Sequence, residues 1–443
     1  MLGAFVNAFR TPDLRKKLLF VLFIVAIFRL GSQIPAPGVN VPNVQTCFAA
    51  TADSGIYGLI NLFSGGALLQ LTIFALGVMP YITASIILQL LVVVIPRLEA
   101  LKKEGQSGQA KITQYTRYLT IVLAVMQSTA FVTMAVTGQL FQGCALPVVY
   151  DTTVFPIVVM VLTMTAGTGI VMWLGELITE RGVGNGMSIM IFTQIAAAFP
   201  AQTWGIAVSR GTQEIAGITI PNASGWMAFL AVLAVGLVVM LGVIFVEQAQ
   251  RRIPVQYAKR MVGRRLVGGS TTYIPLKVNQ AGVIPVIFAS SMLYLPMMLS
   301  QFFPDNLVSQ WIGANMLPGQ SPWYNVLEFF LIIAFAYFYV SITFNPEEVA
   351  DNMKKYGGFI PGIRAGRPTE RYLAHVLSRL TAPGSLYLAT IAMIPAIAFL
   401  ALGTSQQFPF GGTSILIIVG VGLDTVKQIQ SQLQQRNYEG FLR

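Results

Sequence analysis

Long apolar segments separated by short polar ones run through almost the whole chain. A helix needs about 20 mostly apolar residues to cross the hydrocarbon core of a bilayer. The segments that approach or reach this length are residues 18–34, 75–95, 118–136, 154–174, 187–207, 226–245, 281–302, 323–344, 382–402 and 413–425. This pattern predicts an all-α polytopic membrane protein with ten transmembrane helices, of which the last is short for a crossing.

The composition supports a membrane protein. Of the 443 residues, 55% are hydrophobic and only 10% are charged, whereas a soluble domain averages about 25% charged residues. All the Lys and Arg residues except Arg29 and Arg210 lie in the two termini or in alternate loops. The net charge of +11 is therefore a property of loops on one side of the membrane, and it does not indicate a soluble nucleic-acid binder. By the positive-inside rule, both termini are expected in the cytoplasm.

The ten segments divide into two groups of five. An odd number of crossings gives the two halves opposite orientations, which is typical of inverted repeats around a central pathway. Arg29 interrupts the first segment and no small-residue cleavage site follows it, so we expect a retained helix rather than a signal peptide. The expected organisation is a cytoplasmic N-terminus (1–17), a first half (18–207), an outer hinge loop (208–225), a second half (226–428) and a cytoplasmic tail (429–443).

The second apolar region, residues 56–95, is too long for one crossing. It is interrupted by Ser64-Gly65-Gly66, by Gly77 and by Pro80. Non-helical backbone at membrane depth is tolerated only inside protein or beside water. We interpret residues 59–72 as a short re-entrant half-helix that precedes a crossing beginning near residue 75. The alternative is an amphipathic helix lying on the outer leaflet.

The sequence predicts no catalytic or metal site and no cofactor. The single histidine, His375, falls in a cytoplasmic loop, and the glycine-rich residues 182–186 lack the lysine and Ser/Thr of a phosphate-binding loop. Ionisable residues within the crossings are few, namely Arg29, Glu328 and Asp424, and each lies near a helix end, so they form no proton relay.

A pore closed by apolar side chains, which exclude water and ions by dewetting, fits this chemistry. The alternative is an ion-coupled secondary transporter with inverted repeats, and a membrane receptor or scaffold is a third class.

Two loops are longer and more basic than membrane orientation requires. Residues 247–277 carry seven basic residues against one acidic residue, and residues 345–379 have an apolar and basic tip. Such loops suit a partner with acidic patches or an RNA backbone, although membrane topology and contact with anionic lipid are the alternative. Cys47 and Cys144 both fall on the outer side, where they form either a disulfide or two unpaired thiols.

Specific strings resemble the SecY/Sec61-alpha family of protein-conducting channels, and they are spread over essentially the whole chain in the family order. They are residues 61–69 (NLFSGGALL), 74–91 (FALGVMPYITASIILQLL), 102–119 (KKEGQSGQAKITQYTRYL), 172–190 (MWLGELITERGVGNGMSIM), 250–261 (QRRIPVQYAKRM), 276–292 (LKVNQAGVIPVIFASSM), 359–367 (FIPGIRAGR) and 410–418 (FGGTSILII). The resemblance implies two inverted five-helix halves around a central pore with a re-entrant plug. It also implies a bacterial plasma-membrane protein that exports unfolded preproteins and inserts membrane proteins laterally, and that is not itself an enzyme.

The resemblance also implies roles for individual residues. The apolar pore ring would be Val78, Ile82, Ile191, Ile287 and Ile417. Val78 is a mild departure, because family members commonly have isoleucine there. The plug motif would contain Asn61, Phe63, Ser64, Gly65 and Gly66.

The second and seventh helices would form most of a lateral gate that opens toward lipid, with a polar cluster of Thr83, Gln127 and Asn279. Arg264, Arg265 and Arg364 align with positions that contact the SecA motor or the ribosome. The implied partners are SecE, SecG, the SecA ATPase, the ribosome, signal peptides, unfolded preproteins and membrane lipids.

Overall fold

The structure is a computed structural model of the 443-residue chain. It describes residues 11–51, 67–68, 70–138, 140, 144, 146–208, 213–215, 218–220, 225–257, 260–262, 265–267, 271–302, 306–316, 321–402 and 412–441. The predicted plug residues Asn61, Phe63, Ser64, Gly65 and Gly66 and the predicted docking residue Arg264 lie outside the described residues.

The described chain is mostly helical, as the hydropathy predicts. The helices are α2 (Pro12–Gly31), α3 (Val41–Thr51), α5 (Met79–Val94), α6 (Pro96–Lys103), α7 (Gln106–Val136), α8 (Val154–Arg181), α9 (Gly186–Val208), α10 (Gly225–Gln248), α11 (Ile284–Phe302), α12 (Leu307–Asn315), α13 (Pro322–Thr343), α14 (Pro346–Lys355), α15 (Arg367–Leu402) and α16 (Gly412–Phe441). The strands are β1 (Gln213–Ile215), β2 (Ile218–Ile220), β3 (Gln250–Tyr257), β4 (Arg260–Val262), β5 (Arg265–Val267), β6 (Thr271–Lys277) and β7 (Gly358–Phe359).

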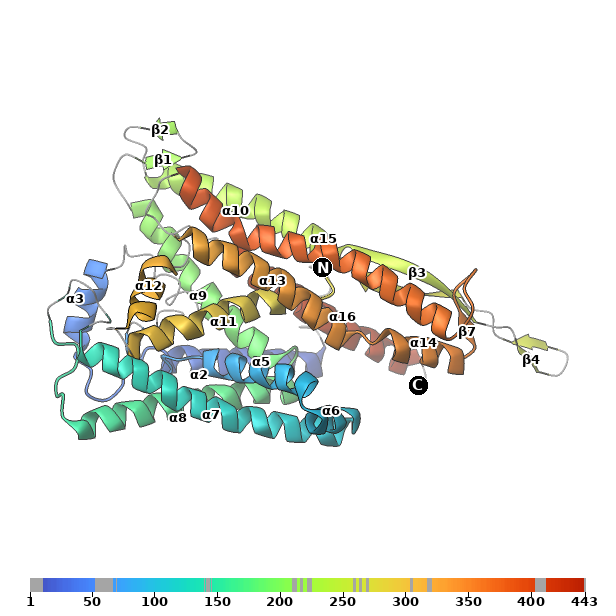
Figure 1. Ribbon diagram of the computed structural model, residues 1–443, viewed down its shortest axis with the longest axis horizontal. Coiled ribbons are helices and arrows are strands. Elements are labelled where there is room, and N and C mark those ends of the chain that lie inside the picture. Colours follow the sequence, from blue (N-terminus) through green and yellow to red (C-terminus); the bar gives the residue numbers. More distant parts are fainter. Residues whose placement is uncertain are drawn as a thin grey trace.

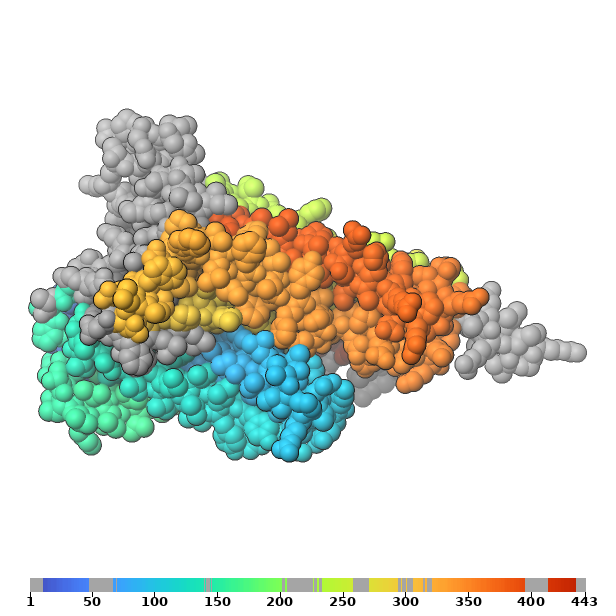
Figure 2. Space-filling model, viewed as in Figure 1, coloured from blue at the N-terminus to red at the C-terminus, as the bar shows by residue number. Residues whose placement is uncertain are grey.

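The long helices run side by side along the long axis of the molecule (Figure 1). One end carries α3 and α12, and the other end carries α6, α14 and β7. In the space-filling view, α5 to α8 form one side of the molecule, and the elements from α11 onward form the other side (Figure 2). The two parts of the sequence thus occupy opposite sides of the bundle.

Several described helices are long and apolar enough to cross a membrane. By length and composition, Gln106–Val136, Val154–Arg181 and Pro322–Lys355 each qualify. α5 and α6 qualify only as a pair, and they are bent by 99° at the break between them. Gly186–Pro200, Leu233–Gln248 and Ile284–Leu293 are shorter apolar helices. The number of crossings, ten, stays a prediction.

Helix α5 begins later than the hydropathy predicts. The expected crossing starts near residue 75, but residues 73–78 form turns and the helix starts at Met79. Gly77 has a φ of +54°, and a Cβ there would overlap the Gln194 side chain, so only glycine fits. Pro80 lies in the first turn of the helix, where its missing N–H costs nothing. Residues 67, 68 and 70–72 are also turns or a bridge, and the re-entrant half-helix over 59–72 stays a prediction.

The irregular chain before α5 is supported by the chain that follows α2. Ala36 N donates to Leu71 O at 2.8 Å, and Ile73 N donates to Ile34 O at 2.9 Å. These bonds flank an antiparallel bridge between Pro35 and Thr72. They satisfy backbone groups that a helix would otherwise satisfy, as burial among apolar helices requires.

The two basic loops fold into one unit, which the sequence did not predict. β3 and β6 form an antiparallel hairpin, with Gln250 opposite Lys277 and Gln256 opposite Thr271. β7, from the second loop, pairs with β3. Ile253 and Leu276 of the hairpin are buried in one cluster with Met353 of α14 and Leu373 of α15. A single small core therefore holds both loops.

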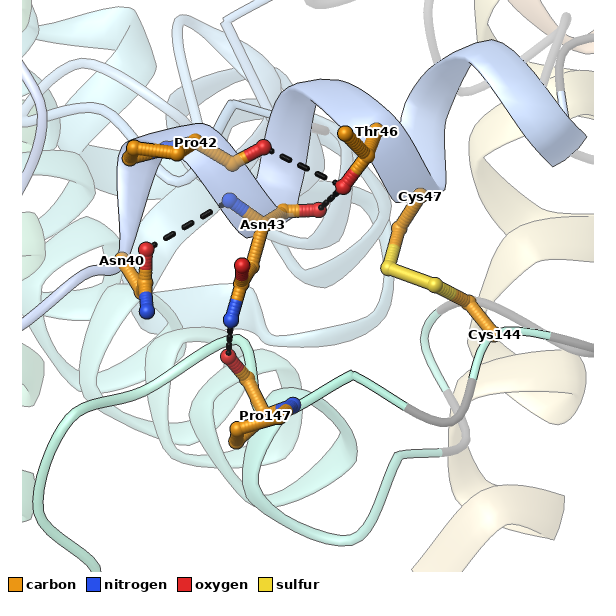
Figure 3. The surroundings of a disulfide bond; sticks show 7 residues. All are labelled: Asn40, Pro42, Asn43, Thr46, Cys47, Cys144 and Pro147. Carbon is orange, nitrogen blue, oxygen red and sulfur yellow. Dashed lines mark hydrogen bonds between the residues drawn. A yellow bond between two sulfur atoms is a disulfide. The ribbon is translucent and has the colours of Figure 1, made fainter.

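The structure pairs the two cysteines, whose state the sequence left open. Cys47 of α3 and Cys144 form a disulfide with a Cα–Cα distance of 5.5 Å (Figure 3). The two residues are 97 positions apart in the sequence. They belong to a second apolar cluster, which includes Phe131, Leu140 and Met164. This cluster lies at the end of the molecule that carries α3.

We predict that Gly167→Ala in α8 destabilises the protein. A Cβ at Gly167 would overlap the Ile73 carbonyl, so the backbone must shift at a cost of about 1–3 kcal/mol. The midpoint of thermal unfolding in detergent should fall. Gly169→Ala is the matched control, because a Cβ there meets nothing within 4 Å. Equal midpoints for the two variants would show that α8 and the chain before α5 do not pack as described.

Candidate pore, gate and docking unit

The five predicted ring residues lie together in the main apolar cluster of the molecule. Val78 is the N-cap residue of α5, Ile82 is one turn further along, and Ile191 and Ile417 come from α9 and α16. These four residues are between 1% and 9% exposed. Ile287 of α11 is partly buried and packs against the same cluster. Helices from both parts of the chain therefore contribute to one apolar contact region.

Three buried polar atoms near this cluster have no hydrogen-bond partner in the part of the chain that the structure describes. They are Gln194 Nε2, Ser291 Oγ and Ser414 Oγ. Each residue lies about one helical turn from a predicted ring residue on its own helix, on α9, α11 and α16 respectively. The sequence does not predict these three residues, because isolated Gln and Ser residues carry no distinguishing pattern.

The three polar residues lie on the same side of the ring. α9 follows the turn after α8, and α11 follows β6, so both begin at the end of the molecule opposite α3. α16 runs the other way, because Asp424 near the end of its apolar stretch lies 3.5 Å from Lys277 of β6. Gln194 and Ser291 come after the predicted ring residue on their own helix, and Ser414 comes before it. Because α16 runs opposite to α9 and α11, all three polar residues lie on the side of the predicted ring that faces α3.

The predicted gate residues are buried, but their described hydrogen bonds do not join them to one another. Thr83, Gln127 and Asn279 are 4%, 2% and 2% exposed. Thr83 Oγ1 donates to Met79 O within α5. The helices that carry or follow these residues nevertheless meet, because α5 packs on α7, and α11 packs on both.

The Asn279 side chain connects α10 to the start of α11. Its Nδ2 donates to Glu247 Oε1 and also to Gly282 O, the latter at 3.1 Å. Glu247 is only 7% exposed, so its carboxylate depends on protein donors. In the sequence, Glu247 belongs to a basic loop, and the pair is not predictable there because the partners are 32 residues apart.

The predicted docking arginines have different positions in the structure. Arg364 is exposed in the turn that follows β7, and its carbonyl oxygen accepts a hydrogen bond from Thr369 Oγ1 at 2.8 Å. Arg265 begins β5, which pairs with β4. Because β7 pairs with β3, Arg364 is attached to the same unit as the hairpin. Residues of both basic loops are thus presented by one folded surface.

A second charged surface lies at the same end of the molecule, on α6. The Lys103 ammonium lies 2.7 Å from Glu99 Oε1 and lowers the pKa of that carboxyl through this hydrogen bond. Both side chains are exposed, so the pair contributes little to stability. No group of three or more His, Cys, Asp or Glu residues within the described ranges is suited to hold a metal ion.

The glycine-rich residues 182–186 form a tight turn between two helices. α8 ends at Arg181 and α9 begins at Gly186, whose N–H donates to Thr179 Oγ1 at 2.9 Å. Gly184 has a φ of +94°, and a Cβ on Gly186 would overlap the Gly175 carbonyl. The glycines therefore serve a tight turn.

Comparisons with known proteins agree with this architecture. A protein-family profile described as SecY matches residues 72–426. The protein translocase subunit SecY of Streptomyces galbus is 64% identical over the full length of both chains, and that of Mycobacterium bovis is 58% identical, again over the full length of both. Protein translocation, and not ion-coupled solute transport, is the activity that these names describe.

Solved structures share the fold at low sequence identity. A structure described as a protein conducting channel is 18% identical, with a TM-score of 0.63 over 94% of this chain and 91% of that one. Sec61 from a canine ribosome–channel complex is 17% identical, with a TM-score of 0.60 over 94% and 91%. On the strength of its family profile and full-length relatives, the chain belongs to the SecY family of protein-conducting channels.

Proposed function

We propose that this chain forms the pore through which unfolded preproteins cross a bacterial plasma membrane, and from which apolar segments leave sideways into lipid. The observation that carries this proposal is the single apolar cluster to which α5, α9, α11 and α16 contribute Val78, Ile82, Ile191, Ile287 and Ile417. An apolar constriction of this kind excludes water and ions by dewetting, and it can widen around a large passenger. The chain itself carries no catalysis in this proposal.

The unpartnered polar atoms beside the ring support a conducting role. A buried polar atom without a partner costs about 1–3 kcal/mol, so three of them near one cluster call for an explanation. In our proposal, Gln194, Ser291 and Ser414 offer hydrogen bonds to the backbone of a passing chain on the outer side of the ring. The ring itself offers none, so a passenger does not adhere to it.

The lateral gate lies between α11 and the pair α5 and α7 in our proposal. Ile82 and Ile86 of α5 belong to one apolar cluster with Val286 and Phe288 of α11, and an apolar signal segment can replace such contacts at little cost. Glu247 and Asn279 fix the start of α11 to α10. The gate helix α11 therefore remains attached to its own half while its contacts with α5 and α7 separate.

Two independent observations support an orientation with both termini in the cytoplasm. The basic residues gather at the end with α6, β3 and α14, as the positive-inside rule requires of a cytoplasmic end. The disulfide lies at the opposite end, and disulfides persist in oxidising compartments outside the cytoplasm. The plug, predicted over 59–72, would lie on the outer side of the ring.

Energy must come from partners, since the proposed pore has only a passive role. We propose that the unit formed by β3, β6, β7, α14 and the start of α15 docks the SecA ATPase or the ribosome. Its basic side chains suit acidic protein patches or an RNA backbone. The canine Sec61 structure was obtained in a ribosome–channel complex, which supports the ribosome as a partner. SecE and SecG are proposed as membrane partners.

We predict that replacing Ile82 and Ile287 with Gly raises the resting ion conductance of the reconstituted channel several-fold. The change removes two apolar side chains from the proposed seal, and water then wets the constriction. Single-channel recording in a planar bilayer measures this directly. Ile86→Gly, one turn further along α5 in the same cluster, is the control for a general packing defect. An unchanged conductance would assign these isoleucines to packing alone.

We predict a specific coupling between Glu247 and Asn279. Asn279→Leu leaves a buried carboxylate without its donor and should lower stability by about 1–3 kcal/mol. The double change Glu247→Leu with Asn279→Leu should recover part of this loss, because both partners then become apolar. Thermal unfolding of all variants in detergent completes the cycle. Strictly additive effects would mean that the two residues do not interact.

We predict that Arg364→Glu slows motor-driven export about tenfold, which corresponds to a free-energy change of ~1.4 kcal/mol. The reversed charge repels an acidic docking surface, while membrane insertion of the channel itself continues. Arg379→Glu is the matched control, because it makes the same change in net charge but Arg379 lies three turns inside α15. This variant should export the preprotein at the native rate. Export of a radiolabelled preprotein into vesicles is the measurement. Equal rates for both variants would remove Arg364 from the docking surface.

A further inference from the structure

The disulfide is one part of a larger attachment between α3 and the chain that follows α7. Asn43 Nδ2 donates to Pro147 O at 2.8 Å (Figure 3). Asn40 N donates to Val148 O, also at 2.8 Å. Val39 and Val149 form an antiparallel bridge beside these bonds. The cysteines thus close one end of a contact that already has several hydrogen bonds.

The same attachment holds the outer end of α7. α7 ends at Val136, and Leu140 N donates back to Met134 O at 3.1 Å, so the chain folds against the end of its own helix. Cys47 packs in one apolar cluster with Met134 and Leu140. The disulfide therefore joins α3 covalently to the chain that packs against the end of α7.

The two cysteines differ in their exposure to solvent. Cys47 has no exposed surface, whereas Cys144 is partly exposed. Cys144 also lines a surface cavity of about 400 Å³ formed by the end of α7, around Ala135, and by the chain from Leu146 to Val149. Cys144 lines this cavity, and Cys47 is not among its lining residues. The exchange of thiols with disulfides depends on which sulfur the attacking thiolate reaches.

We propose that the Cys47–Cys144 disulfide is an exchangeable clasp on the gate helix α7, and that low-molecular-weight thiols open it by attack at Cys144. This inference rests on the gate proposed above. The attacking thiolate forms a bond to Cys144 Sγ, the Cys144–Cys47 bond breaks, and Cys47 leaves as a thiolate that takes up a proton. The product is a mixed disulfide on Cys144. Return of the Cys47 thiolate to Cys144 expels the small thiol and closes the clasp.

Opening the clasp affects the gate because α7 packs on both α5 and α11. Gln127, one of the proposed gate residues, lies on α7 about two turns before the attached end. With the clasp open, no covalent bond joins the two segments, and the described contacts between them are the hydrogen bonds of Asn40, Asn43 and Tyr150, the Val39–Val149 bridge and apolar packing. The outer part of α7 then gains freedom, while its other end, near α6, is unaffected.

The site of attack is tested with glutathione as the probe. The native channel in lipid vesicles is treated with excess reduced glutathione, quenched with acid, alkylated and digested, and the adducts are measured by mass spectrometry. We expect at least tenfold more glutathione on Cys144 than on Cys47, with Cys47 recovered in alkylated form. A preference for Cys47, or no adduct on the folded channel, would overturn the proposal.

The consequence for α7 is tested by hydrogen–deuterium exchange on the Cys47→Ser, Cys144→Ser double variant. We expect faster exchange over residues 128–136 and native exchange over residues 107–117. Glutathione should produce the same change in the native channel and no further change in the variant. Thr46→Ala is the matched control, since it removes a neighbouring side chain of α3 and leaves the clasp intact. Native exchange over 128–136 in the double variant would overturn the proposal.

A parallel conductance recording separates this inference from the gate on which it rests. If exchange over 128–136 rises and the resting conductance also rises, both stand. If exchange rises and neither conductance nor export changes, the clasp exists but α7 is not part of a gate, and the proposed role in gating fails. The hydrogen–deuterium readout does not depend on conduction, so the two failures are distinguishable.

Discussion

Backbone hydrogen bonding in an apolar environment is the constraint on which the rest of the structure depends. Hydrocarbon offers no partner to an N–H or a C=O, so each buried backbone group must find one within the protein. Helices meet this demand locally, which explains why they dominate the chain. The irregular segment before α5 meets it through the chain after α2, where Ala36 and Ile73 donate across the Pro35–Thr72 bridge. The irregular segment before α5 is therefore held by hydrogen bonds to the chain that follows α2.

Hydropathy predicted where helices form better than where they end. The segment expected over 118–136 is the apolar part of α7, which begins at Gln106, because a helix continues into polar residues wherever its polar face meets solvent. α15 and α16 extend beyond their expected segments for the same reason. The β3–β6 hairpin was missed because its seven-residue register places only Ile253, Val255 and Leu276 in a core. So weak an alternation of buried and exposed positions is hard to recognise in a segment rich in Lys and Arg.

The candidate site shows a similar division. Resemblance to a family supplied the five ring positions, and the structure gathers them into one cluster. Other side chains of the candidate site could not be predicted from the sequence, because their positions relative to one another depend on tertiary contacts. Gln194, Ser291 and Ser414 have no distinguishing sequence pattern, but their helices bury Gln194 Nε2, Ser291 Oγ and Ser414 Oγ without a partner among the described residues. Glu247 belongs by composition to a basic loop, and only the fold brings it to Asn279.

A channel of this kind must hold a tight seal with contacts weak enough to part. The structure separates the two requirements in space. Strong and directional links lie within each proposed half, such as the Glu247–Asn279 pair between α10 and α11 and the disulfide between α3 and the chain after α7. Between the halves, Ile82 and Ile86 of α5 share one apolar cluster with Val286 and Phe288 of α11, and apolar packing has no fixed direction. In the proposed opening, the halves separate without losing their internal order, because the interactions that are costly to break are not the ones that opening breaks.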